Sequence, residues 1–466
     1  MRWRDGHKNL LAAIMMMGLF RRIIDTAASH FTAGGRGEAL AHALLGGLGL
    51  RLVAMGLGFM IGVQLARGLG PSGYGMYGIA MSVISLMMIP LEFGIPQLVT
   101  REVAATPPGG IRSTAILTWS WRVVMFNSLI LLVIAVPAIL WNSSTADTSL
   151  RNALLCGLLM LPTVAASNIV SASLRGLQRV IEGQIAELII RPAVISLSLF
   201  VLWQANSHVT APMAMTLNAV AAVIGAAYAY SRLSPEFSSI AQVRPTREMR
   251  AAWLRSAFPL AMGDGMRILS GQLGILLLGW FAATDEVGTY RVALGIYMVA
   301  TLPSALLNAT CSPMLARLNA EGRLDAIQRL NGWMTLFLFA SASACILPFA
   351  IAGESIISMI FGAEYAAAGP ILLTLLFGEI AAAAIGHPTI VLNMLRHEYA
   401  VTQFSILAMT LNFALCWMLI PSLGGGGAAL GAALSQLAWR VAASWHAHRH
   451  FGLHTSVLAW TRGSRK

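Results

Sequence analysis

The chain contains twelve apolar runs, each long enough to cross a lipid bilayer as a helix. A bilayer core about 30 Å thick needs about 20 apolar residues in helical form. Inside it the backbone must satisfy its own hydrogen bonds, which favours helices. Twelve membrane-spanning helices are therefore predicted, over residues 41–66, 76–98, 114–140, 153–172, 185–203, 211–231, 257–280, 289–313, 331–351, 369–391, 400–420 and 427–447.

The composition agrees with a membrane protein and excludes a soluble enzyme. Of the 466 residues, 57% are hydrophobic and 11% are charged, whereas soluble domains contain about 25% charged residues. The four cysteines lie inside apolar runs and form no CxxC pair. This placement indicates neither a disulfide framework nor a metal site.

The basic residues predict which way the helices point. Most of the 31 Lys and Arg lie in the N-terminal segment, in alternate loops and in the C-terminal tail, whereas the opposite loops hold Arg67, Arg151 and Arg291. By the positive-inside rule both termini are expected in the cytoplasm. The net charge of +12 is thus interpreted as orientation charge, and nucleic acid is not expected as a partner.

An internal repeat at an offset of 213 residues divides the chain into halves. Gly75-Met-Tyr77 matches Gly288-Thr-Tyr290, and Pro90 matches Pro303. Because six spans separate the copies, two six-helix bundles of equal orientation are expected, related by an axis along the membrane normal. The predicted organisation is a cytoplasmic, interfacial N-terminal segment at 1–40, bundles at 41–231 and 257–447, a cytoplasmic linker at 232–256, and a basic cytoplasmic tail at 448–466.

Four stretches, in order along residues 41–450, resemble one known family. Leu69-Gly-Pro-Ser-Gly-Tyr-Gly-Met-Tyr77 is similar to the LGPxxYGxY loop of oligosaccharide flippases, the O-antigen and exopolysaccharide repeat-unit translocases. The stretch 93–102 resembles their GxxxxxxRE segment, and 361–365 their FGxxY loop. The stretch 419–429 resembles their LIPxxGxxGAA segment.

The resemblance implies a fold and an activity. The family belongs to the multidrug, oligosaccharidyl-lipid and polysaccharide exporter superfamily, so an all-α, V-shaped, twelve-helix fold is expected, with alternating access and no enzymatic activity. The implied substrate is a polyprenyl-pyrophosphate-linked oligosaccharide. The implied partners are membrane lipids and the polysaccharide polymerase and glycosyltransferases of the same pathway.

Charged residues inside the spans are the candidate site residues, because each costs about 2.5–3.5 kcal/mol to insert. Arg51, Arg267 and Arg122 are the candidate substrate contacts, since guanidinium groups bind phosphate through paired hydrogen bonds. The competing interpretations are that Arg267 neutralises Asp264 three residues away and that Arg122 anchors its helix at the interface.

Three further residues are candidates for ion coupling: Glu379, Asp264 and His387. Glu379 lies in the middle of a span, and the sequence Gly386-His387-Pro388 predicts a helix break that can act as a hinge. The competing interpretation is a buried Glu379 bonded to a neighbouring helix. A coupling cation, H+ or Na+, is the one cofactor considered, and neither catalytic residues nor metal ligands are predicted.

Two other functions stay open. A cation-coupled multidrug exporter of the same superfamily is expected to have a net acidic cavity, because its substrates are usually cationic. A membrane-bound polysaccharide polymerase or ligase is expected to carry a long outer loop with catalytic groups, whereas the predicted outer loops are short.

Overall fold

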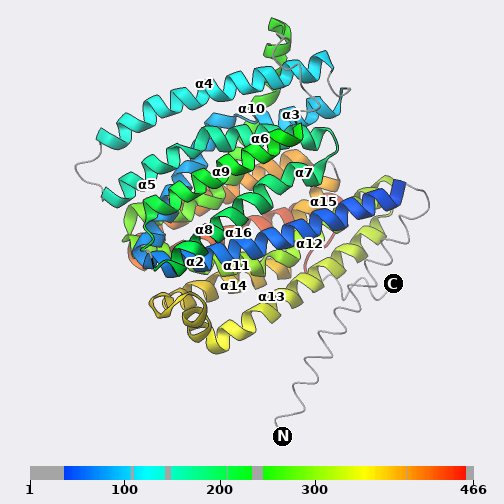
Figure 1. Ribbon diagram of the computed structural model, residues 1–466. Coiled ribbons are helices and arrows are strands. Elements are labelled where there is room, and N and C mark those ends of the chain that lie inside the picture. Colours follow the sequence, from blue (N-terminus) through cyan, green and yellow to red (C-terminus); the bar gives the residue numbers. More distant parts are fainter. Residues whose placement is uncertain are drawn as a thin grey trace. The chain divides into compact units, whose positions relative to one another are not determined.

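The computed structural model describes residues 36–106, 110–141, 148–206, 208–233, 245–395 and 397–457, and these residues form helices and no strand (Figure 1). Two compact units are present, Met1–Val53 and Ala54–Lys466. The described part of the first unit is the beginning of helix α2 (Arg36–Glu92). The predicted interfacial segment at 1–40 lies outside the described residues, apart from 36–40.

The two longest helices are each long enough for two spans. Helix α2 has 57 residues and α16 (Glu398–Phe451) has 54. At 1.5 Å per residue a straight helix of that length would measure about 80 Å, more than twice the thickness of a bilayer core of about 30 Å. Each is interrupted at one glycine with positive φ, Gly70 at 66° and Gly424 at 53°. Glycine adopts this conformation without the penalty a Cβ atom brings.

The other spans follow in two groups. The first bundle continues with α3 (Ile95–Ala104), α4 (Ile111–Trp141), α5 (Thr148–Leu158), α6 (Met160–Gly176), α7 (Val180–Ile185), the π-helix η2 (Ala186–Ile190), α8 (Arg191–Gln204) and α9 (Ala211–Leu233). The second contains α10 (Arg247–Phe281), α11 (Thr284–Ala300), α12 (Leu302–Ala320), α13 (Leu324–Phe361), the short η4 (Ala363–Tyr365), α14 (Ala368–Ile385), α15 (Pro388–Met394) and α16.

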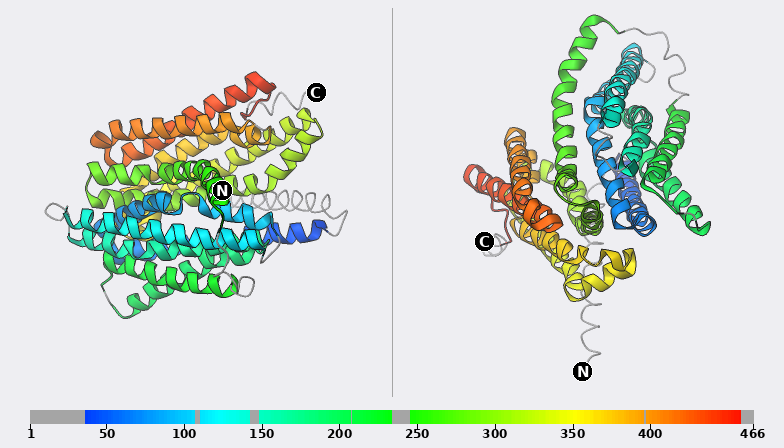
Figure 2. Two further views of the ribbon diagram at one scale, coloured as in Figure 1. Left: turned by 90° about the horizontal axis from the view of Figure 1, so that it is seen from above. Right: turned by 90° about the vertical axis from the view of Figure 1, so that its left-hand side faces the viewer.

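Packing within the second unit separates these groups. Helix α6 packs against α3, α4 and α9, whereas α14 packs against α11, α13 and α16. In Figure 2 the helices coloured blue to green and those coloured yellow to red accordingly lie on two sides. Helix α10 packs against α16 and also against α3 of the first bundle. The second unit is thus built of two helical groups that meet along α10 and α3.

Hydropathy agrees with a multi-pass membrane protein. Eight helical stretches of the described residues are long and apolar enough to span a membrane, and the bent pair α11 and α12 can form a ninth. Helix α10 is not among them, and it carries Asp264 and Arg267 near its middle. Every predicted span lies mostly in described helix, with breaks such as those at Gly94 and Gly386, so the predicted all-α membrane fold is confirmed.

The internal repeat places its two copies in direct contact. A Cβ atom on Gly75 would overlap the carbonyl oxygen of Thr284, and one on Gly288 would overlap that of Pro71. Beside them the hydroxyl groups of Ser72 and Thr284 lie 2.8 Å apart. Small residues at helix crossings let backbones approach closely. The bundles are therefore tightly packed at the end of the spans that is predicted to face outward.

Candidate functional site

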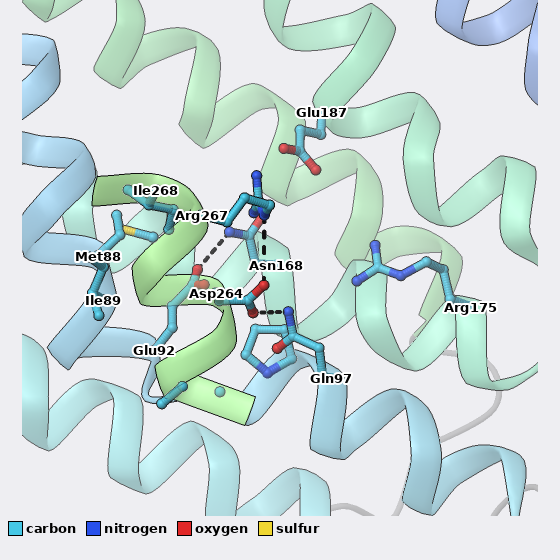
Figure 3. Close-up of a pocket in the computed structure, with 13 residues that line it drawn as sticks. Met88, Ile89, Glu92, Gln97, Asn168, Arg175, Glu187, Asp264, Arg267 and Ile268 are labelled. Carbon is cyan, nitrogen blue, oxygen red and sulfur yellow. Dashed lines mark hydrogen bonds and ion pairs between the residues drawn. The ribbon is translucent and has the colours of Figure 1, made fainter. Parts of the chain in front are cut away.

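A polar cavity of about 200 Å³ lies between the bundles. Figure 3 shows its side chains converging from α2 and α3, α6, η2 and α10. Hydrophobic Met88, Ile89 and Ile268 form part of the wall. The polar residues that line it are Glu92, Gln97, Asn168, Arg175, Glu187, Asp264 and Arg267. Charged groups from both bundles thus meet around one cavity, which is the arrangement expected of a transport site at a bundle interface.

A break between α2 and α3 forms one side of the cavity. Helix α2 ends at Glu92, after which Phe93 and Gly94 have φ angles of 46° and 71°. A Cβ atom on Gly94 would come within 2.6 Å of the backbone of Ala257 in α10. Only glycine combines this positive φ with such a close approach. The break therefore holds α3 against α10 and leaves Glu92 at the cavity.

Hydrogen bonds and one ion pair organise the polar lining. The amide of Asn168 donates to Glu92 Oε1 at 2.6 Å, and the amide of Gln97 donates to the carboxylate of Asp264. Arg267 Nε lies 3.8 Å from Asp264 Oδ1, and the Arg267 side chain is 75% exposed. The predicted pairing of Asp264 with Arg267 is thus present but loose, so Arg267 keeps N–H groups available for a ligand.

The π-helix η2 contributes the third carboxylate of the cavity, that of Glu187. A π-helical turn inserts an extra residue into a helix, and such turns occur frequently at functional sites. From its sequence spacing Glu187 is the i,i+4 partner of Arg191, a pair expected to stabilise an ordinary α-helix. Because the turn changes this spacing locally, a regular-helix pattern does not predict that Glu187 lines the cavity.

Glu379 lies outside the cavity lining, in a buried hydrogen-bond network of the second bundle. Its side chain is buried, with 4% of the residue exposed. Tyr297 Oη donates to Glu379 Oε2 at 2.8 Å, and Gln436 Nε2 donates to the same oxygen at 3.0 Å. These donors belong to α11 and α16, so this carboxylate joins three helices.

Arg440 and His387 lie close to the predicted helix break. Helix α14 ends before Gly386, whose φ is 88°, and α15 begins at Pro388. Arg440 is buried and its Nη1 donates to the carbonyl of Gly386 at 3.3 Å. The buried Nε of Arg440 and the buried Nε2 of His387 have no hydrogen-bond partner within the described residues. The predicted break is present, and it has polar groups beside it.

The remaining two candidates lie outside the cavity lining. Arg122 is exposed on α4, and Arg51 is exposed on the part of α2 that belongs to the Met1–Val53 unit. Of the six candidates, Arg267 and Asp264 line the cavity, and Glu379 and His387 belong to the second bundle.

Sequence reasoning counted Glu92 and Glu187 among the charges inside the spans but gave both a structural explanation, and it did not propose Gln97, Asn168 or Arg175 as site residues. A search for charges deep in the spans passes over the uncharged amides of Gln97 and Asn168. It also places Glu92 and Arg175 near the cytoplasmic surface, where charges are ordinary. The available signal was Gly94, since a glycine two residues after a carboxylate and a proline-containing turn indicates a helix break.

The cavity can hydrogen-bond a polar ligand from many directions. Carboxylates accept, guanidinium groups donate, and amides do both. Within the described residues no group of three or more His, Cys, Asp or Glu side chains is placed to hold a metal ion.

Comparisons with known proteins agree with this description. Residues 48–319 match the family described as polysaccharide biosynthesis protein. The probable low-salt glycan biosynthesis flippase Agl15 of Haloferax volcanii is 24% identical over 402 residues, which cover 84% of this chain and 79% of the relative.

Two solved structures share the fold. The lipid II flippase MurJ in an inward closed conformation has a TM-score of 0.71 and 11% identity, over 89% of each chain. A multidrug resistance transporter of the MATE family and the MOP superfamily, in an inward-facing conformation, has a TM-score of 0.69 and 13% identity. That match covers 88% of this chain and 94% of the transporter.

Proposed function

Because the chain belongs to the polysaccharide biosynthesis protein family, we propose that it is a flippase for a polyprenyl-pyrophosphate-linked oligosaccharide. It moves the glycan across a bacterial inner membrane by alternating access, with both termini in the cytoplasm. The substrate is an O-antigen or exopolysaccharide repeat unit. The activity of Agl15, described as a probable glycan biosynthesis flippase, supports the proposal.

The observation that carries the proposal is a polar cavity on one side of a tight bundle contact. The cavity lies where α10 meets the first bundle, at the end of α2 that leads into α3. At the other end of the same α2 arm, Gly75 packs against the backbone of α11. Alternating access requires this asymmetry, with a site reachable from one side while the other side is closed.

Additional contacts join the two bundles near the end of α2 where Gly75 packs against α11. The guanidinium of Arg291 lies 5.0 Å from the ring centroid of Tyr74 and 5.2 Å from that of Tyr77. Arg67 Nε donates to the carbonyl of Ile360 at 2.8 Å. Cation–π contacts and single hydrogen bonds are each worth about 0.5–2 kcal/mol. Together these contacts stabilise the closed end. Each of them is weak enough to break when the transporter opens.

Arg267 is the proposed contact for the diphosphate, since it lines the cavity and is largely exposed. Arg51 and Arg122 are proposed as secondary contacts for the same anionic group along its path. Asp264 in the cavity, and Glu379 with His387 in the second bundle, are the proposed groups for coupling to H+ or Na+. Dependence of transport on a pH gradient or on a Na+ gradient identifies the ion.

Deletion of the gene tests the proposal. Surface polysaccharide should be lost, and lipid-linked repeat units should accumulate in the cytoplasmic leaflet. The purified protein in liposomes should expose a fluorescent polyprenyl-diphosphate saccharide to an external lectin. Normal surface glycan in a strain without a redundant flippase would contradict the proposal.

One observation favours a second candidate, a multidrug exporter. The cavity carries three carboxylates and two arginines, and cationic drugs prefer an acidic site. Drug sensitivity of the deletion strain separates the two functions: altered sensitivity with unchanged glycan supports the exporter.

A further inference from the structure

We propose that the cavity binds the sugar attached to the diphosphate of the lipid-linked glycan. It selects a neutral or amino sugar over an acidic one at this position. The inference rests on the proposed function and assigns a substrate class to the same cavity. Its volume of about 200 Å³ is below the roughly 300–1,000 Å³ of pockets that enclose drug-sized ligands. The cavity therefore takes a single sugar ring, and the rest of the glycan stays outside it.

The charge of the lining carries the first step. Glu92, Glu187 and Asp264 face Arg175 and Arg267, a formal balance of three negative against two positive groups. Arg267 is next to Asp264, and Arg175 is attracted by Glu187 and Glu92. The positive charge of each arginine is therefore balanced by at least one nearby carboxylate. If Arg267 also binds the diphosphate, Arg175 alone opposes three carboxylates around the sugar.

Hydrogen-bond capacity carries the second step. An ionised carboxylate has about four acceptor positions and no donor, and Glu92 uses one of them for Asn168. The free positions suit hydroxyl and ammonium groups, which donate. A uronic-acid carboxylate donates nothing when ionised, and it brings a like charge towards Glu92 and Asp264. Like charges facing each other across a binding site are strongly unfavourable.

The apolar wall beside the carboxylates supports a ring. Met88 and Ile89 on α2 and Ile268 on α10 line the cavity beside the polar groups. A sugar ring has C–H groups on its faces and hydroxyl groups at its rim. A site with an apolar wall and carboxylate–amide pairs matches both surfaces at once.

The test uses the full chain in liposomes and three probes. Each probe is the same short-chain polyprenyl diphosphate, linked to glucose, glucosamine or glucuronic acid. We expect the protein to flip the first two about tenfold or more faster than the third, because a like-charge contact costs at least the 1.4 kcal/mol that corresponds to a factor of ten. Equal rates for the three probes, or a faster rate for glucuronic acid, would overturn the inference.

A charge-removing variant attributes the selection to this cavity. The double change Glu92→Gln with Asp264→Asn should reduce the preference for glucosamine over glucuronic acid to below about threefold. Glu248→Gln is the matched control, since Glu248 is an exposed carboxylate on the same helix as Asp264 and lies outside the lining. It should keep the full preference, and an unchanged preference in the double variant would contradict the assignment.

The outcomes separate this inference from the function on which it rests. If the folded protein flips all three probes without preference, the selection is wrong and the flippase proposal stands. If it flips none of them, the flippase proposal fails and the selection fails with it. Folding of each variant is checked by its monodisperse elution in detergent before reconstitution.

Discussion

Glu92 in the first bundle and Glu379 in the second each accept hydrogen bonds from a neighbouring helix, and the two differ in what surrounds them. In the first bundle Glu92 accepts from Asn168 and lines the cavity. In the second, Glu379 accepts from Tyr297 and Gln436 and is buried. The same chemistry thus serves two purposes. A carboxylate with free acceptor positions at a cavity can bind a ligand, whereas a buried one that accepts from two other helices holds helices together.

Removing the two carboxylates should affect folding very differently. Glu379→Ala leaves the Tyr297 hydroxyl and the Gln436 amide without their acceptor in a buried site, at a cost of about 1–3 kcal/mol each. Glu92→Ala opens onto a cavity where water can replace the carboxylate, so its cost should be below about 1 kcal/mol. Thermal unfolding of the purified variants in detergent measures both. Equal losses of stability in the two variants would contradict the different roles assigned to Glu92 and Glu379.

A more conservative substitution tests the role of Glu379 further. Glu379→Gln keeps one acceptor oxygen for Tyr297 and should restore most of the stability lost in Glu379→Ala. If Glu379 also couples transport to an ion, this variant should fold and yet lose its response to an imposed pH or Na+ gradient. A variant that folds and still responds would leave Glu379 with a structural role alone.

The contact between the repeat copies tests whether the cavity needs a closed far end. In Gly288→Ala the new Cβ atom meets the carbonyl oxygen of Pro71, a backbone atom that cannot rotate away. Overpacking of this kind costs roughly 1–3 kcal/mol. Gly295→Ala on the same helix is the control, because its Cβ atom would have no neighbour within 4 Å. Flipping should fall in the first variant and persist in the second.

Substitutions of Arg267 test the role of the cavity in this comparison. If it binds phosphate, each charge-assisted hydrogen bond is worth about 1.5–3 kcal/mol, and Arg267→Gln should slow flipping about tenfold with normal folding. Arg267→Lys should rescue only in part, since Lys lacks the planar pair of donors. If Arg267 serves only to neutralise Asp264, the double change Asp264→Asn with Arg267→Gln should restore activity. Flipping normalised to folded protein distinguishes the two.

The smallest effect is expected at Arg122. Its side chain is exposed on α4 and outside the cavity lining. Arg122→Gln should therefore change flipping by less than about threefold, as is typical for an exposed charge whose interactions are worth below about 1 kcal/mol. A loss as large as that of Arg267→Gln would make Arg122 a primary rather than a secondary substrate contact.

Much of the fold is predictable because its causes are local. An apolar run of about 20 residues must become a helix in a bilayer, whatever its neighbours are. The break at Gly386, His387 and Pro388 and the proximity of Asp264 to Arg267 also follow from short-range spacing. The contact of Gly75 with α11 was partly foreseeable, since the repeat matches Gly75 to Gly288.

The candidate site needed the tertiary structure. Glu92 meets a side chain 76 positions away, and Glu379 meets one 82 positions away. Whether a charge on a helix faces a cavity, a neighbouring helix or lipid depends on how the helix is rotated within its bundle. That rotation results from packing against several other helices. The sequence therefore determined the apolar spans and their repeat, whereas only the packing of the spans decided that Glu92 lines a cavity and that Glu379 is buried.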